Sequence, residues 1–276
     1  MQGIASVSRW VALWLMVALF AEVVLASRAT AAGLIQPQPI PRDLVQAVES
    51  ARRMGQLLYL YDNDTADASD AAQQFASGRR DPPVRGWLVD RDNGAATVTF
   101  FAEQGDEPFP VYHVHLHGST AAPVVEPAAP AELPTSEQRS MWRARKTALA
   151  AEVARCSRAY NTVVLRGDVL KLPGWLVYLI PATTEPGRIL VGGYYRVHLS
   201  PRGDKVLGVT SFSKGCLAIP AQGTAAGAYF NHLLSDAPTE THVFLSRLHR
   251  KPMYVATPRG AWQVDGDTIT FLGSPQ

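Results

Sequence analysis

The sequence has little excess charge, few cysteines and none of the common catalytic signatures. Its 276 residues include 26 Lys and Arg against 24 Asp and Glu, and this balance predicts no special affinity for nucleic acid or anionic membranes. It contains no GxSxG, GxGxxG, P-loop or HExxH motif, and the sequence signals for the corresponding enzyme classes are therefore missing. We expect no nucleic-acid partner and no cofactor, and the sequence does not indicate a ligand.

The longest apolar run lies at the N-terminus. Arg9 precedes an apolar stretch at residues 10–20, and residues 29–31 have the small-residue pattern of a signal-peptidase site. We predict a secretory signal peptide over residues 1–31. The alternative, an uncleaved membrane anchor, needs about 20 apolar residues and would place Glu22 inside the bilayer. The protein is expected to be exported, either periplasmic or secreted, with no membrane span after cleavage.

The chain has two cysteines, Cys156 and Cys216. An even number of cysteines in an oxidising compartment predicts one disulfide bond. This bond would close a loop of about 60 residues and contribute about 4 kcal/mol to stability in the chain-entropy model. The alternative is that Cys216 is a free, reactive thiol.

The first half of the chain has the pattern of helix followed by antiparallel strands. Apolar residues recur at helical spacing over residues 44–61, and a second short helix is expected over residues 66–76. Asn93-Gly94 predicts a tight hairpin turn. Strands are predicted around and after this turn, at residues 84–90, 95–102 and 111–117. The proline-rich residues 119–134 predict an extended linker or a long surface loop.

The second half repeats this order. Thr135 and Gln138 form a capping box before a helix that is expected to continue to about Cys156. Four antiparallel strands are predicted next, in the segments YNTVVL, GWLVYLIPA, ILVGGYYRVHLS and KVLGVTSF. A short helix is expected over residues 225–234. Further strands are predicted at the C-terminal end, in the segments THVFLSRL, PMYVAT, AWQV and TITFLG.

Helices followed by a strand meander, occurring twice, predict an α+β protein in which helices pack on antiparallel β-sheet. The order excludes alternating βαβ units and a dinucleotide-binding sheet. The expected organisation is a first α+β half at residues 32–118, a linker or loop at 119–134, and a second α+β half at 135–276. The two halves form either separate domains or one domain.

Three histidines alternate along the predicted strand VYHVHLHG, at positions 113, 115 and 117. Residues i and i+2 lie on one face of a strand about 6.6 Å apart, so His113 and His115 could share a metal ion that the outer pair could not. A third ligand would have to come from the remaining histidines, at positions 198, 232, 242 and 249. The alternative is a half-exposed strand, with Val114 and Leu116 inward and the imidazoles outward.

The segment SKGCLAIP at residues 213–220 resembles the active-site motif of L,D-transpeptidases, exported enzymes that cross-link peptidoglycan through a cysteine acyl-enzyme. Ser213, Gly215, Cys216 and Leu217 match that motif, and an upstream histidine, His198, precedes them. The resemblance implies a divergent cysteine-dependent cell-wall acyl-transferase, with Cys216 as nucleophile and His198 as base.

The same segment departs from the motif at positions that matter for the chemistry. Lys214 and Ala218 stand where the motif has histidine and arginine, and Leu199 follows His198 in place of glycine. A cysteine nucleophile reacts as its thiolate, which a nearby imidazolium stabilises. Adjacent residues of a strand point to opposite faces, so Lys214 is poorly placed to replace that imidazolium.

Four phrases of the second half resemble an uncharacterised group of exported bacterial proteins: CSRAYNTVVL, LVYLIPATTEPG, GGYYRVHLSPRGDKV and SFSKGCL. The resemblance carries no known activity. Both cysteine-bearing phrases occur together in that group, which supports structural pairing of Cys156 with Cys216.

Three functional hypotheses remain open at this point. The first is an exported, disulfide-stabilised binding or structural protein without catalytic machinery. The second is the acyl-transferase that uses Cys216 and His198. The third is a metal-binding module that uses His113 and His115. The first is favoured because no catalytic constellation is complete in the sequence.

Overall fold

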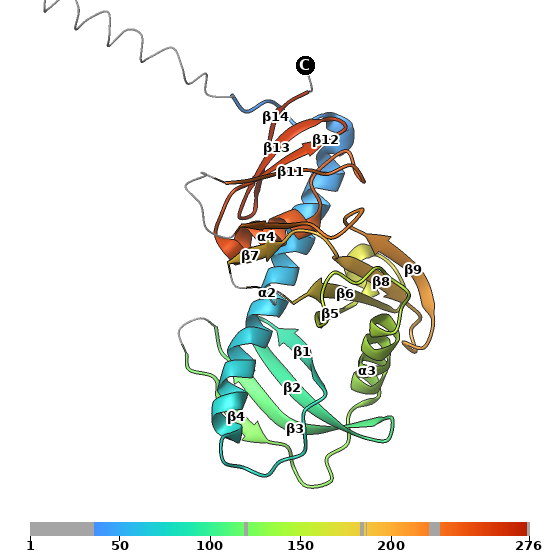
Figure 1. Cartoon of the computed structure of the whole chain (residues 1–276). Coiled ribbons are helices and arrows are strands. Elements are labelled where there is room, and N and C mark those ends of the chain that lie inside the picture. Colours follow the sequence, from blue (N-terminus) through green and yellow to red (C-terminus); the bar gives the residue numbers. More distant parts are fainter. Residues whose placement is uncertain (1–35, 119–120, 183–184, 186, 221–226, 275–276) are drawn as a thin grey trace, which may run out of the picture. The chain divides into compact units, whose positions relative to one another are not determined.

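The N-terminal part of the described chain forms one long helix (Figure 1). The computed structural model describes residues 36–118, 121–182, 185, 187–220 and 227–274, and the signal peptide predicted at residues 1–31 lies outside them. A 3-10 turn, η1 (Arg42–Leu44), leads into α2 (Val45–Ala76). Residues 66–76 are helical as expected, but they form the end of α2 rather than a separate helix, because no glycine or proline lies between the two predicted helices, at residues 62–65.

The first sheet contains the predicted hairpin. Its antiparallel order is β1-β2-β3-β4, with bounds Gly86–Asp92, Ala95–Gln104, Glu107–Leu116 and Val124–Pro127. The turn at Asn93 and Gly94 has positive φ at both residues, 46° and 87°, as a two-residue hairpin requires. That prediction is confirmed. β4 lies within the stretch expected as a linker or loop, and one face of the sheet packs against the second half of α2.

The second sheet is the predicted four-stranded antiparallel meander. Its order is β5-β6-β8-β9, with bounds Tyr160–Arg166, Trp175–Pro181, Tyr195–Leu199 and Val206–Ser211. A 3-10 turn, η2 (Gly167–Leu170), follows β5. Helix α3 (Ser136–Leu149) packs on this sheet and begins at the capping box of Thr135 and Gln138, which is confirmed. The helix ends at Leu149, so the expectation that it reaches Cys156 is wrong.

The C-terminal part differs from the prediction at two elements. The third sheet has the order β11-β12-β13-β14, with bounds Ala228–Asn231, Met253–Thr257, Gly260–Asp265 and Thr268–Gly273. β11 replaces the short helix expected over residues 225–234, because it pairs in parallel with the distant β12. Residues 221–226 lie outside the description. The segment THVFLSRL, expected as a strand, belongs to helix α4 (Glu240–His249).

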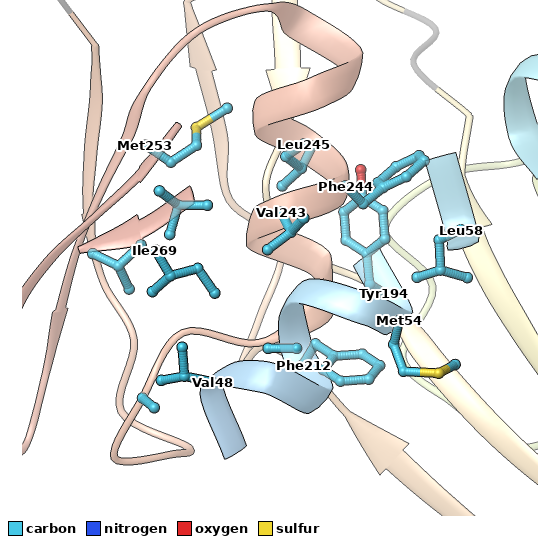
Figure 2. Close-up of a cluster of buried hydrophobic side chains, with 14 of the residues drawn as sticks. Val48, Met54, Leu58, Tyr194, Phe212, Val243, Phe244, Leu245, Met253 and Ile269 are labelled. Atoms are coloured by element: carbon cyan, nitrogen blue, oxygen red, sulfur yellow. The ribbon is translucent and has the colours of Figure 1, made fainter. Parts of the chain in front are cut away.

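The first seven residues of α4 are all buried, which explains why the sequence pattern did not indicate a helix. Its middle residues Val243, Phe244 and Leu245 are at most 1% exposed, so the segment lacks the polar face that makes helical periodicity visible in a sequence. Figure 2 shows these side chains packed among Val48, Met54 and Leu58 of the first half of α2. The same cluster includes Tyr194, Phe212 and residues of the third sheet.

The described residues from Gln38 onward form one compact unit. The remaining short strands, β7 (Arg188–Leu190) and β10 (Ala218–Pro220), pair with each other in an antiparallel arrangement. The fold is thus α+β with helices packed on largely antiparallel sheets, as predicted. Among the residues that the structure describes, no helix is both long and apolar enough to cross a membrane.

Candidate functional site

A pocket of about 240 Å³ lies where the chain leaves β9 and passes the end of β11. Residues 212–217, immediately after β9, form one wall. Residues 230–234, at the end of β11 and just beyond it, form another, and His242 of α4 reaches the floor. The apolar floor residues Phe212 and Phe230 belong to the main hydrophobic cluster, so the pocket opens directly above the core.

A disulfide bond borders this pocket. Cys216 is bonded to Cys156, with a Cα–Cα distance of 5.2 Å, as the sequence predicts. Cys156 packs tightly on Gly193: a Cβ on this glycine, whose φ is +88°, would lie 2.7 Å from the Cys156 sulfur. A larger residue at position 193 would therefore displace the disulfide. The bond holds the pocket wall to the loop between α3 and β5.

Two buried histidines meet at the floor of the pocket. His232 follows β11 and His242 lies in the first turn of α4, yet their ring centroids are 4.7 Å apart in an edge-to-face arrangement. Phe230 stacks on His242 with centroids 5.3 Å apart. Burial lowers the pKa of His242 to about 3 and also lowers the pKa of His232. Both imidazoles are therefore uncharged at neutral pH.

The hydrogen bonds of these histidines determine where their protons lie. The Thr239 backbone N–H donates to His242 Nδ1 at 2.8 Å, so a neutral His242 carries its proton on Nε2. The Ser235 hydroxyl donates to the Ala237 carbonyl at 2.5 Å, which makes its oxygen the acceptor for His232 Nε2 at 2.8 Å. His242 thus retains an N–H donor, and His232 retains an unprotonated Nδ1.

No acidic side chain is found among the described residues that line the pocket. Lys214 supplies an exposed ammonium group, and Asn231 and Ser213 supply neutral polar groups. Three exposed leucines surround these polar groups: Leu217, Leu233 and Leu234. Such a pocket favours a ligand that combines an apolar body with a negatively charged group.

The structure does not place both residues of the predicted catalytic pair, Cys216 and His198, in this pocket. Cys216 lines the pocket, but its sulfur is bonded to Cys156, and a disulfide sulfur has no thiolate to act as nucleophile. His198 lies on β8, where its Nε2 is 2.8 Å from the Pro173 carbonyl oxygen, and it does not line this pocket. The acyl-transferase hypothesis therefore remains a prediction about the reduced protein.

The histidine strand has the predicted alternation. His113 and His115 lie on one face of β3, with ring centroids 6.5 Å apart, while Val114 and Leu116 are buried on the other. Threonine hydroxyls of β2 lie 3.1 Å from the Nδ1 atoms of both histidines. His113 Nε2 lies 3.0 Å from a carboxylate oxygen of Glu132.

Within the described ranges, no group of three or more His, Cys, Asp or Glu side chains is arranged to hold a metal ion. The metal-binding hypothesis for His113 and His115 therefore stays a prediction.

A second cavity, of about 510 Å³, lies between α2, β1, the start of α3 and β5. Its two arginines already have partners: Arg91 pairs with Asp64, and Arg166 pairs with Glu137. Two further carboxylates, Asp90 and Asp168, also line this cavity, so it is less suited to an anionic ligand than the pocket beside the disulfide is.

Sequence reasoning missed the pairing of His232 with His242. They belong to different elements, and the parallel pairing of β11 with β12 and the position of α4 bring them together. Their spacing in the sequence matches no ligand motif, so no local signal could have selected them.

No protein-family model, curated protein or solved structure matches this chain. A function therefore has to be inferred from the chemistry of the pocket.

Proposed function

We propose that this protein is an exported, non-catalytic binding protein whose pocket beside the Cys156–Cys216 bond holds a small apolar carboxylate. The observation that carries the proposal is the lining of the pocket: one ammonium group, neutral donors, apolar walls and, among the described residues, no acid. A carboxylate would be repelled by none of these groups. The disulfide supports a binding role, because it leaves Cys216 in the pocket wall without a free thiol.

The polar groups have separate roles in this proposal. Lys214 supplies the charge that attracts the carboxylate, and the Nε2–H of His242 supplies a donor from the floor. Because His242 is uncharged and buried, its donor is held in place without the cost of a desolvated cation. The leucine rim and the aromatic floor contact the apolar body of the ligand.

The volume limits the size of the ligand. A cavity of about 240 Å³ corresponds to about eight water molecules at about 30 Å³ each. An unbranched carboxylate such as octanoate is of suitable size to serve as a probe. Octylammonium and octan-1-ol have the same alkyl chain with a positive or a neutral head group, which makes them matched controls.

Isothermal titration of the oxidised protein tests the proposal. Octanoate is expected to bind more tightly than octan-1-ol, and octylammonium least tightly. Lys214→Gln is expected to weaken octanoate binding about three- to tenfold, which is less than the usual loss for a hydrogen bond to a charged group, because Lys214 is exposed. Lys205→Gln, which removes an exposed lysine outside the pocket lining, should leave binding unchanged. Equal affinity for octanoate and octylammonium, or equal effects of the two substitutions, would overturn the proposal.

Export and the absence of catalysis have their own tests. The exported protein is expected to begin at Ala32. Alkylation under denaturing, non-reducing conditions should modify no thiol, and the mass should be about two hydrogens lower than that of the reduced chain. Two alkylated thiols in the native material would instead favour the acyl-transferase that uses Cys216.

A further inference from the structure

The second sheet ends in an unprotected edge. β9 is the last strand in the order β5-β6-β8-β9 and pairs with β8 on one side; no described strand pairs with its other side (Figure 1). An edge strand presents a row of backbone N–H and C=O groups that can pair with another extended chain. The opposite edge, β5, instead contacts β1 of the same chain.

The side chains of β9 do not discourage pairing. All six residues, Val206–Ser211, are exposed, including Leu207 at 53% and Val209 at 47%. Natural edge strands are commonly protected by charged residues or proline, and β9 contains neither. A register shift against β8 between His198 and Leu199 places a bulge near the start of the strand. Its later residues are regular.

The apolar side chains of β9 lie on one identifiable face. Val209 is directly opposite Val197 of β8, and directly opposite residues share a face of the sheet. Val197 is fully buried in the cluster between the sheet and α3. Val209 therefore points to the α3 side of the sheet, and Leu207, two residues earlier, does so too. Their exposure shows that α3 does not extend over β9.

We propose that β9 pairs antiparallel with β9 of a second copy of this chain, with a two-fold axis near Val209. This register places Val209 opposite Val209 of the second copy and puts Leu207 on the diagonal next to it. The Leu207 and Val209 side chains of the two copies, four in all, then pack together on the side of the sheet where α3 does not cover β9. Gly208 lies opposite Thr210 of the second copy, and the register brings no two like charges together.

A second copy fits this edge better than an unlimited stack does. Each copy has one exposed edge on this sheet, since β5 is mostly buried and contacts β1, so a symmetric contact closes after two chains. The two four-stranded sheets would become one eight-stranded sheet. This interface is separate from the proposed ligand pocket, although the pocket wall at residues 212–217 follows β9 directly.

Sedimentation analysis over a range of concentrations tests the dimer. The wild-type protein is expected to have twice the monomer mass. Val209→Lys and Val209→Glu each place two like charges at the axis and should raise the dissociation constant at least about tenfold. Val209→Thr keeps a β-branched, uncharged residue and should remain dimeric. Leu133→Lys, at an exposed leucine on another part of the surface, is the control and should also remain dimeric.

Mixing the two charged variants tests the register itself. Lysine on one copy and glutamate on the other lie opposite each other, so a heterodimer is expected where neither variant dimerises alone. Circular dichroism should show that every variant is folded, because the substituted side chains are exposed. A wild-type protein that is monomeric at all concentrations would overturn the proposal. Dimers of Val209→Lys as stable as those of the wild type would overturn it too.

Discussion

Replacing Asp62 by asparagine is expected to stabilise the folded protein at neutral pH and to have little effect at pH 4. Asp62 lies in the middle of α2, and no described residue forms a hydrogen bond or an ion pair with its carboxylate. Burial raises its pKa from 3.8 to about 6. The ionised carboxylate also raises the pKa of the neighbouring Tyr194, a smaller cause than the burial of that hydroxyl.

The sign and size of the effect follow from the pKa shift. Because the pKa of Asp62 is higher in the folded state, the folded state is favoured while this group is protonated. That advantage is complete below about pH 4 and is lost as the pH rises through about 6. A shift of about two units corresponds to about 3 kcal/mol of destabilisation at pH 7. Asparagine has no charge to desolvate, so Asp62→Asn should recover about 2–3 kcal/mol between pH 4 and pH 7.

Urea unfolding of the oxidised protein at both pH values measures this difference. Asp70→Asn is the matched control, because Asp70 is an exposed carboxylate on the same helix. Its substitution should change the free energy of unfolding by less than about 0.5 kcal/mol at either pH. The reasoning is refuted if Asp62→Asn changes stability equally at pH 4 and pH 7, or if it behaves like the Asp70 variant.

Two further substitutions test the interior of the fold by urea unfolding at pH 7. Glu240→Gln should destabilise the protein by about 3 kcal/mol, at the low end for a broken buried pair. Its carboxylate accepts hydrogen bonds from Tyr178 at 3.0 Å and from Arg196 at 2.7 Å. The Arg196 side chain is 22% exposed to solvent. A loss below about 1 kcal/mol would show that Arg196 is adequately hydrated without it. The double variant Cys156→Ser, Cys216→Ser should lose about 4 kcal/mol, because the bond spans a sequence separation of 60 residues. Unchanged stability would exclude the structural role of the bond.

The elements that could be predicted have local or strictly periodic signals. The hairpin at Asn93 and Gly94 follows from two residues that tolerate positive φ. The capping box at Thr135 is contained within four residues. The alternation of His113 and His115 with buried neighbours is the period of a strand. Each signal is independent of the rest of the chain.

The elements that were missed depend on distant parts of the chain. The first seven residues of α4 are buried, and its threonine, valine and phenylalanine favour strand when considered alone. β11 is a strand because β12 pairs with it in parallel, a contact that local composition does not encode. The pocket was missed for the same reason: Cys216 was visible as a motif residue, whereas its neighbours His232 and His242 become neighbours only in the folded protein.

The packing of α2 against α4 limits the order in which the parts of the protein can fold during synthesis. The two helices are in extensive contact, yet α4 is synthesised roughly 180 residues after Leu58, which takes about 10–35 s at ordinary rates of translation. Gln38 likewise cannot form its β-bridge with Phe271 until the last strand has been synthesised. Throughout that interval, the first half of α2 lacks the apolar contacts that α4 and the third sheet supply. The first half of α2 therefore acquires its full set of apolar contacts only after the C-terminal segment has been made.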